Sequence, residues 1–473
     1  IKNAAMIKNK VYLKEIDWPN FGEADPIIYP SATELTERIE KCRQVMEERA
    51  LTHLVVYGDR EHFGNIMYLT HFDPRFEEAL LLITKENDPL ILVGNECVSH
   101  LSVSPLYNNG SLRYERYQPF SLLDQPRDES RSLAEILSEE GIDKESRIGC
   151  IGWKYYSRLE FEHHQHVIEI PSFIVDMLRS LSSYENVINV TDMLMAPSYG
   201  LKSFLSSFEI AHFEFVNVMA SEGMKSLITN FKSDITDFDL AKEYRYTGYP
   251  LGCHIGMKSS GNQSIGLSSP VGALIEKGLP FSTGISYWGS NICRAGWVAE
   301  SEHDLPEDAQ DYVSNFAGPY FYACTKWLEN LKIGTKGGVL RQLIDEHLPF
   351  EDFGVFLNPG HLIHYEEWLS SPIYPNSEEE IHSGMYMQVD IIPRSKKYST
   401  SRMEDGVVIA DNHLRNKVKE EYPEVYERCM KRRSFMIDVL GINLPEEVLP
   451  LSNIPSLVPP FFLNHKKVLS LKP

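Results

Sequence analysis

The sequence contains no run of about 18 consecutive apolar residues, so we expect no segment to cross a membrane as a helix. Basic residues are in the minority: 46 Lys and Arg stand against 67 Asp and Glu, which gives a formal net charge of -21. A surface with this balance does not neutralise phosphate groups, which excludes broad nucleic-acid binding. The start of the sequence also lacks the apolar stretch of a secretory signal.

Cysteine is scarce as well, and no two cysteines form a C-x-x-C pair. The seven cysteines are scattered along the chain and odd in number. This pattern is typical of reduced thiols in a cytoplasmic protein, and the clustered Cys and His of a structural zinc site are missing. We therefore expect a cytoplasmic location, with neither disulfides nor structural zinc.

Apolar residues, by contrast, make up 42% of the 473 residues, which is enough for two or three domains with large cores. Ser31-x-x-Glu34 is a capping-box pattern that starts a helix. Short apolar runs then predict strands at residues 54–57, 66–69, 79–83 and 90–93. We therefore expect residues 1–195 to form an α/β domain with a mixed sheet, in which the first 30 residues are an extended arm.

The pattern changes after this first domain. Apolar residues on one side predict a long helix over residues 206–230, and Gly- and Ser-rich sequence predicts a twisted antiparallel sheet over residues 252–297. A second long helix is expected directly after Pro306. We place a second domain at residues 196–440 and a proline-containing surface tail at residues 441–473.

Seven short segments carry a further pattern, and they follow one another in a fixed order. They are NIMYLTHF (65–72), LKSFLSSFEI (201–210), SGNQSIGLSSP (260–270), GSNICRAG (289–296), PGHLIHYEEW (359–368), SGMYMQVDIIP (383–393) and SRMEDGVVI (401–409). In this order they resemble segments of the creatinase/aminopeptidase P family. The resemblance covers residues 31–412 and implies an α+β protein, with a creatinase-like N-terminal α/β domain followed by the family's pita-bread domain.

The peptidases of that family bind two divalent metals through two Asp, one His and two Glu. The resemblance assigns these positions to Ser282, Asn291, His361, Asp390 and Glu404, so that both Asp are replaced and one Glu is an Asp. Two close divalent ions need several anionic oxygens to offset their repulsion. We therefore expect no metal here; a single Mn or Fe ion at the last three positions is the alternative.

Creatinase, within the same family, hydrolyses a C–N bond without metal, using the His at the position of His361. The resemblance therefore implies a metal-independent hydrolase that cleaves a C–N bond of a small polar metabolite. His361 would be the acid–base residue, with Asp390 and Glu404 as its catalytic partners. His364, three residues on, is a competing candidate for the functional histidine, and no cofactor is expected.

Residues near these positions are candidates for substrate binding. Leu267 stands where the family has a substrate-facing His, and Ser282 and Asn291 replace the two Asp. His364 and Arg294, the arginine of the family's S-D-x-T-R segment, complete this set. A buried structural ion pair is the alternative role of Arg294.

Arg75 and Phe76 are the substrate-binding candidates in the first domain. In creatinase-like dimers, one subunit contributes aromatic and Arg side chains to the partner's pocket, so the resemblance also implies a homodimer. A surface ion pair between Arg75 and Glu78 is the alternative.

Two other functions remain open from the sequence. A pita-bread scaffold can serve as a catalytically inactive binding protein, and a mononuclear site can serve a metal-dependent hydrolase or lyase. The retention of His361, Asp390 and Glu404 favours an enzyme. Glu366 and Glu367 are expected to be solvated, as adjacent glutamates usually are.

Overall fold

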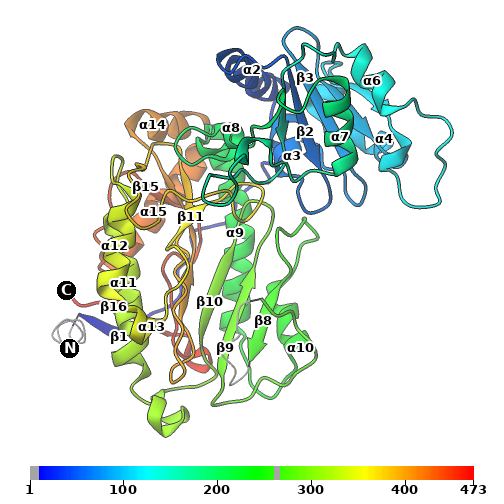
Figure 1. Cartoon of the computed structure of the whole chain (residues 1–473). Helices are drawn as coiled ribbons and strands as arrows, with labels where there is room; N and C mark the ends of the chain where they lie inside the picture. Colours follow the sequence, from blue (N-terminus) through cyan, green and yellow to red (C-terminus); the bar gives the residue numbers. More distant parts are fainter. Residues whose placement is uncertain (1–9, 260–266) are drawn as a thin grey trace. The chain divides into compact units, whose positions relative to one another are not determined.

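The computed structural model describes residues 10–259 and 267–473, which form two compact units (Figure 1). Residues 28–202 form the first, which we call the α/β unit. The second, which we call the two-sheet unit, contains the described residues before 28 and from 203 onward. Both units contain helices and sheets, in agreement with the α+β class predicted from the sequence.

The α/β unit is built on a six-stranded sheet with the order β5-β4-β3-β2-β6-β7. β2 pairs antiparallel with β3 and parallel with β6, so the sheet is mixed, as predicted. Its strands are β2 His53–Gly58, β3 Ala79–Thr84, β4 Leu90–Val93, β5 Arg113–Arg116, β6 Ile148–Ile151 and β7 Val187–Asn189. Its helices are α2 Ala32–Glu48, α3 Gly64–Thr70, α4 Cys97–His100, α5 Pro105–Asn108, α6 Leu133–Glu139, α7 Ser172–Leu181 and α8 Asp192–Met195.

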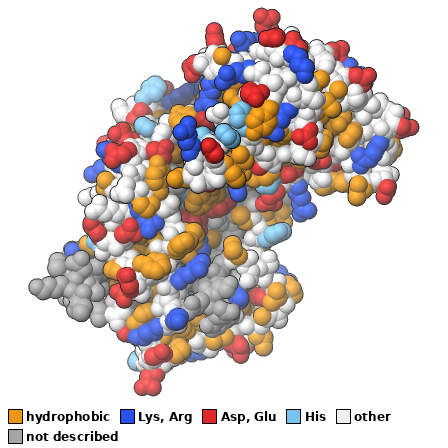
Figure 2. Space-filling view, in the orientation of Figure 1, with side chains coloured by type: hydrophobic (Ala, Val, Ile, Leu, Met, Phe, Trp, Pro, Cys, Tyr) orange, Lys and Arg blue, Asp and Glu red, His pale blue; other side chains and the backbone are white. Residues whose placement is uncertain are grey.

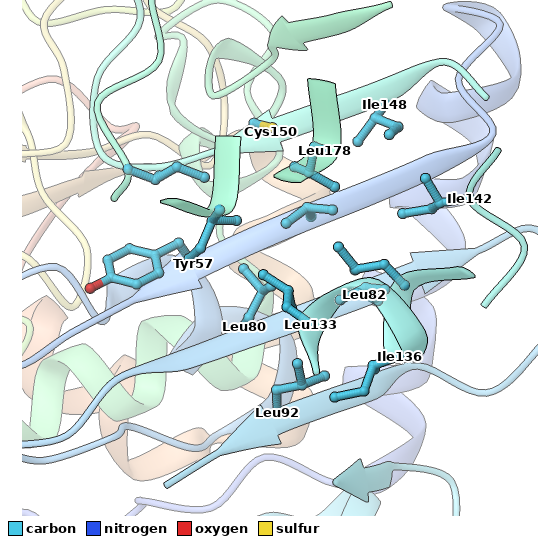
Figure 3. Packing of buried hydrophobic residues seen from close by; sticks show 14 of the residues in the cluster. Tyr57, Leu80, Leu82, Leu92, Leu133, Ile136, Ile142, Ile148, Cys150 and Leu178 are labelled. Carbon is cyan, nitrogen blue, oxygen red and sulfur yellow. The ribbon is translucent and has the colours of Figure 1, made fainter. Parts of the chain in front are cut away.

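Helices α6 and α7 cover one face of this sheet. Figure 3 shows Leu133 and Ile136 of α6 beside the strand residues Leu80 and Leu82, and Leu178 of α7 near Cys150 and Ile148 of β6. The prediction of a strand at 66–69 is wrong, because these residues belong to the buried helix α3. A run of four apolar residues has no period that separates a buried strand from a buried helix.

The two-sheet unit contains two four-stranded antiparallel sheets, with the orders β13-β10-β9-β8 and β11-β12-β14-β15. Their strands are β8 Gly256–Ser259, β9 Pro280–Ile285, β10 Ile292–Trp297, β11 His361–Leu362, β12 Tyr386–Gln388, β13 Arg402–Glu404, β14 Gly406–Ile409 and β15 Val448–Pro450. The helices are α9 Ser207–Thr229, α10 Asp237–Ala241, α11 Gly318–Glu329, α12 Gly337–His347, α13 Phe350–Phe353, α14 Asn412–Glu421 and α15 Pro423–Asp438. The second long helix, α11, begins later than expected, after a π-helical turn over Val313–Ala317.

The two ends of the described chain meet in the two-sheet unit, which differs from the predicted domain boundaries. β1 (Val11–Glu15) pairs antiparallel with β16 (Lys467–Leu471) (Figure 1). Val468 and Leu469 are fully buried. The described part of the predicted arm, up to residue 27, and the predicted surface tail are therefore parts of this unit, because β1 of the arm pairs with β16 of the tail and the tail buries Val468 and Leu469.

Helix α9 packs against β9 and β10, and a capping box fixes its first residue. Ser206 accepts a hydrogen bond from the backbone N–H of Glu209 at 3.1 Å, and the Glu209 carboxylate accepts one from the N–H of Ser206 at 3.1 Å. This pair satisfies two N–H groups that have no partner within the helix. The predicted helix over 206–230 is thus confirmed almost to the residue.

We expect Ser206→Ala to lower the free energy of unfolding of the two-sheet unit by about 1 kcal/mol, because the cap oxygen is lost. Ser206→Gly is expected to cost only a few tenths of a kcal/mol. Urea unfolding followed by tryptophan fluorescence measures both changes, since every Trp except Trp153 lies in this unit. Equal effects of the two variants would contradict a capping role.

Among the described residues, none of the helices combines the length and the apolar composition that a membrane crossing needs. On the face shown in Figure 2, acidic and basic side chains are interspersed.

Candidate functional site

The two sheets of the two-sheet unit bring one histidine and three carboxylates together. His361 opens β11, Asp390 follows β12 by two residues, and Glu404 ends β13. Glu367 joins them from the segment after β11. One ligand atom from each of these four side chains lies within 4.8 Å of the others. We call these four residues the acidic cluster.

His361 is fully buried, and both of its ring nitrogens face acceptors. Nδ1 lies 3.0 Å from the carbonyl oxygen of Leu362, which assigns a hydrogen to Nδ1. Nε2 lies 3.2 Å from Glu367 Oε1 and 3.5 Å from Asp390 Oδ2. Burial alone would lower the pKa of His361, but Glu367 and Asp390 outweigh it and hold the pKa well above its ordinary value. The two carboxylates therefore favour the protonated form of the ring.

Two further side chains donate hydrogen bonds to the carboxylates of the cluster. Arg402 donates from Nη2 to Asp390 Oδ1 at 3.1 Å and to Glu404 Oε2. Asn291 donates from Nδ2 to Glu404 Oε1 at 2.9 Å and to Glu367 Oε1 at 3.3 Å. Each of the three carboxylates thus faces at least one donor from the protein itself.

The pKa values of the two most buried carboxyl groups move in opposite directions. Burial, with the negative charge of Asp390, raises the pKa of Glu404 to about 8. Burial would also raise the pKa of Asp390, but the contact with His361 Nε2 at 3.5 Å and the charge of Arg402 lower it. The charge of Arg402 thus favours the ionised form of Asp390, whereas burial favours the protonated form of Glu404.

Sequence reasoning missed three residues of this site. Glu367 was expected to be solvated, yet its side chain is only 21% exposed and its carboxylate contacts His361. Arg402 precedes Glu404 by two residues on a strand, a spacing that places both side chains on one face and could have indicated the pair. Trp368 stacks on the His361 ring with 4.1 Å between ring centroids.

The competing histidine, His364, is also buried but belongs to a different contact. Its Nε2 lies 2.6 Å from Oε2 of Glu209, the residue that caps α9. The edge of its ring meets the ring of Phe213. His364 therefore ties its loop to α9, whereas His361 is the histidine within the acidic cluster.

Arg294 is fully buried, and its contacts correct its assignment as a substrate-binding residue. All five of its N–H groups donate within the protein: to the Asp405 carboxylate and to the carbonyl oxygens of Cys293, Glu404, Ile454 and Leu457. No N–H group is left for a ligand, so the alternative role as a structural ion pair is confirmed for Arg294.

The remaining candidates of the two-sheet unit lie at different depths. Ser282 is buried on β9 and pairs with Ala295 of the neighbouring strand β10. Ala295 and Cys293 lie on the same face of β10, and Cys293 pairs with Glu404 of β13. The Leu267 side chain is fully exposed, so its expected place at the site is not supported. Most of the segment 260–270, which resembles a strand of the family, lies outside the described residues.

Arg75 and Phe76 lie in the α/β unit, between α3 and β3. About half of each side chain is exposed, and Arg75 Nε lies 3.4 Å from Asp73 Oδ2. The Arg75–Glu78 pair considered from the sequence is not the contact observed, because Glu78 accepts a hydrogen bond from Tyr57 at 2.5 Å. A role of Arg75 and Phe76 in a partner's site stays a prediction.

The cluster fits one divalent ion better than two. Its imidazole and three carboxylates are ligand types that suit Mn or Fe, and their spacing allows them to meet around one ion. A second ion would need the bridging carboxylate that Asn291 replaces. Instead of presenting an anionic oxygen, Asn291 turns its Nδ2 donor toward Glu404 and Glu367. Position 291 therefore offers no carboxylate to bridge a second ion.

Comparison with known proteins places the fold. No protein-family model and no curated protein matches the sequence. The prolidase from Pyrococcus horikoshii OT3 is 14% identical, with a TM-score of 0.60 over 79% of this chain and 95% of that chain. The Xaa-Pro dipeptidase from Bacillus anthracis is 15% identical, with a TM-score of 0.60 over 80% and 96%.

A third similar structure is the N-terminal domain of the FACT complex subunit SPT16 from Cicer arietinum. It is 13% identical, with a TM-score of 0.55 over 80% of this chain and 94% of that chain. At such identities the likeness concerns the fold alone. The chain thus has the pita-bread fold that its sequence segments predicted, in the form found in prolidases and Xaa-Pro dipeptidases.

Proposed function

We propose that this protein is a metal-independent hydrolase that cleaves a C–N bond of a small polar metabolite, with His361 as its acid–base residue. One observation carries this proposal: His361 Nε2 faces the carboxylates of Glu367 and Asp390. Arg402 donates to Asp390 Oδ1 and to Glu404 Oε2, and Asn291 donates to Glu404 Oε1. The cluster therefore holds an acid beside a base without needing a further cation.

Glu367 and His361 can complete a proton cycle during hydrolysis. Glu367 accepts a proton from water as the water oxygen bonds to the substrate carbon. The C–N bond then breaks, and His361 donates its Nε2 proton to the leaving nitrogen. The proton held by Glu367 returns to His361 across the 3.2 Å between Oε1 and Nε2, which restores the starting state. The buried surroundings strengthen each of these electrostatic interactions.

Asp390 and Glu404 support this cycle without transferring the proton themselves. Asp390 binds Arg402 through Oδ1 and faces His361 through Oδ2, so it orients the imidazolium. Glu367 is the most exposed member of the cluster and is the side chain a substrate meets first. The indole of Trp368 covers one face of the His361 ring, so a substrate reaches Nε2 only when Trp368 or Glu367 moves.

A mononuclear metal hydrolase is the second candidate, favoured by the convergence of four ligand atoms within 4.8 Å. His361, Glu367, Asp390 and Glu404 would hold the ion, which would supply Lewis-acid activation of water. A catalytically inactive binding protein is the third, and the likeness to a subunit of the FACT complex favours it. The scaffold alone does not choose among the three.

Turnover of a metabolite library by the metal-depleted protein separates these functions. After treatment with EDTA, we expect one or more amides, ureas or amidines to be hydrolysed, with products identified by mass spectrometry. Addition of Mn²⁺ or Fe²⁺ should leave the rate unchanged. Turnover only after metal addition would favour the mononuclear enzyme, and a ligand that binds but stays intact would favour the binding protein.

A further inference from the structure

Gln388 lies beside His361 on the strand pair next to the acidic cluster. The two residues pair directly across β11 and β12, so their side chains stand on the same face of the sheet. Asp390 follows Gln388 by two residues, a spacing that returns to this face, and its Oδ2 lies 3.5 Å from His361 Nε2. Directly paired residues have Cβ atoms about 4.5–5.5 Å apart. A small ligand at the His361 ring therefore lies within reach of the Gln388 side chain.

The Gln388 side chain is fully buried, yet neither polar atom of its amide has a hydrogen-bond partner among the described residues. Its neighbours on the same face do not supply one. Gly406, its partner on β14, has no side chain, and the Tyr386 hydroxyl bonds to a backbone carbonyl and to an asparagine of α9. Asp390 uses its two oxygens within the cluster. An amide buried without partners is unfavourable, and such groups in native proteins are typically satisfied by a bound molecule.

The chemistry of this amide defines what it can bind. Gln388 Oε1 accepts a hydrogen bond and Nε2 donates, so the side chain pairs fully with a group that presents an N–H beside a C=O. Carboxamides and ureas have this arrangement. An amidinium offers only donors and leaves Nε2 unpaired, and a carboxylate offers only acceptors and leaves Oε1 unpaired. Sites that hydrogen-bond one polar group discriminate strongly against analogues that lack it.

We propose that Gln388 binds the substrate through this amide and selects compounds that carry a carboxamide or ureido group. The inference rests on the proposed function and narrows its substrate class to amides and ureas. It is tested by ligand binding without turnover, so the two can fail separately. Hydrolysis of amidines but not of amides or ureas would leave the hydrolase standing and overturn the role of Gln388. Amide binding through Gln388 with no hydrolysis would overturn the hydrolase and leave the selection standing.

Acetamide and acetamidine are matched probes, because they share size and shape and differ in the group that replaces the carbonyl oxygen. Titration of each into the EDTA-depleted protein, followed by saturation-transfer-difference NMR, gives their dissociation constants. Gln388→Met keeps the length of the side chain and removes both hydrogen-bonding atoms. We expect the preference for acetamide over acetamidine, expressed as the ratio of dissociation constants, to fall at least about tenfold in this variant. Without a probe, the variant should unfold at the same or a higher urea concentration than the wild type, because it lacks the unpaired amide.

Gln342→Met is the matched control, because Gln342 is exposed on α12 and donates to Glu346. This variant should keep the wild-type ratio of dissociation constants. An unchanged ratio in Gln388→Met would overturn the proposal, as would undetectable binding of acetamide to the wild type. A lower unfolding midpoint of Gln388→Met would overturn it too, because the amide would then be held by partners within the fold.

Discussion

Replacement of His361 with alanine is expected to lower kcat for the hydrolysed metabolite by about 10²–10⁴-fold, the usual contribution of a general acid–base residue. The reason is specific to this site: Nε2 of His361 is the only donor placed between Glu367 and Asp390 that can protonate a leaving nitrogen, among the residues that the structure describes. Steady-state kinetics of the metal-depleted enzyme measures the loss.

Two further variants make this test specific. Glu367→Gln removes the proposed base while keeping the shape of the side chain, and it should also lower kcat strongly. His364→Ala should instead act on stability, because His364 contacts Glu209 at the start of α9 and lies outside the cluster. If His364→Ala abolished turnover in a folded protein while His361→Ala did not, the assignment of the acid–base residue would be wrong.

Replacement of Arg294 with methionine is expected to lower the free energy of unfolding of the two-sheet unit by about 3–5 kcal/mol. Methionine fills part of the space, but the buried carboxylate of Asp405 loses its ion pair at 2.8 Å. Four backbone carbonyls lose their donors as well. Urea unfolding followed by tryptophan fluorescence measures the change.

Lys431→Met serves as the control, since it breaks an ion pair of α15 in which both side chains are more than half exposed, 57% for Lys431 and 64% for Glu427. Exposed pairs contribute about 0–1 kcal/mol, so this variant should unfold close to the wild-type midpoint. A similar small effect of Arg294→Met would show that the contacts of Arg294 do not hold β10 and β13 together, and would reopen its assignment to substrate binding.

Local sequence patterns predicted the elements with a strong periodic or capping signal. The capping residues Ser31 and Ser206 are N-caps, and strand β4 has the bounds expected from its apolar run. The prediction of a strand at 66–69 failed because the residues packed around this apolar run in the core decide its conformation, and the spacing of its own apolar residues does not. Local patterns also did not predict that the last residues are buried, because β16 pairs with β1, which lies more than 450 residues away in the sequence.

In the candidate site, too, the sequence predicted some residues, and others depend on contacts between distant segments. The order of the sequence segments brought His361, Asp390, Glu404 and Asn291 to attention, and the structure places all four within one set of contacts. The sequence could not show that the Glu367 side chain points toward His361, because two adjacent glutamates in a loop form no repeating pattern that indicates which side chain is buried. It also could not show which carboxylates Arg402 joins, since Asp390 and Glu404 approach it from different segments.

In the proposed enzyme, Arg402 and His361 balance the negative charge of the acidic cluster, and hydrolysis needs no divalent ion. Crystals of the wild-type protein soaked in MnCl₂, with anomalous diffraction collected above the manganese absorption edge, test it most directly. We expect no anomalous peak among His361, Glu367, Asp390 and Glu404. A peak within coordination distance of these side chains, with Arg402 displaced from the carboxylates, would contradict it.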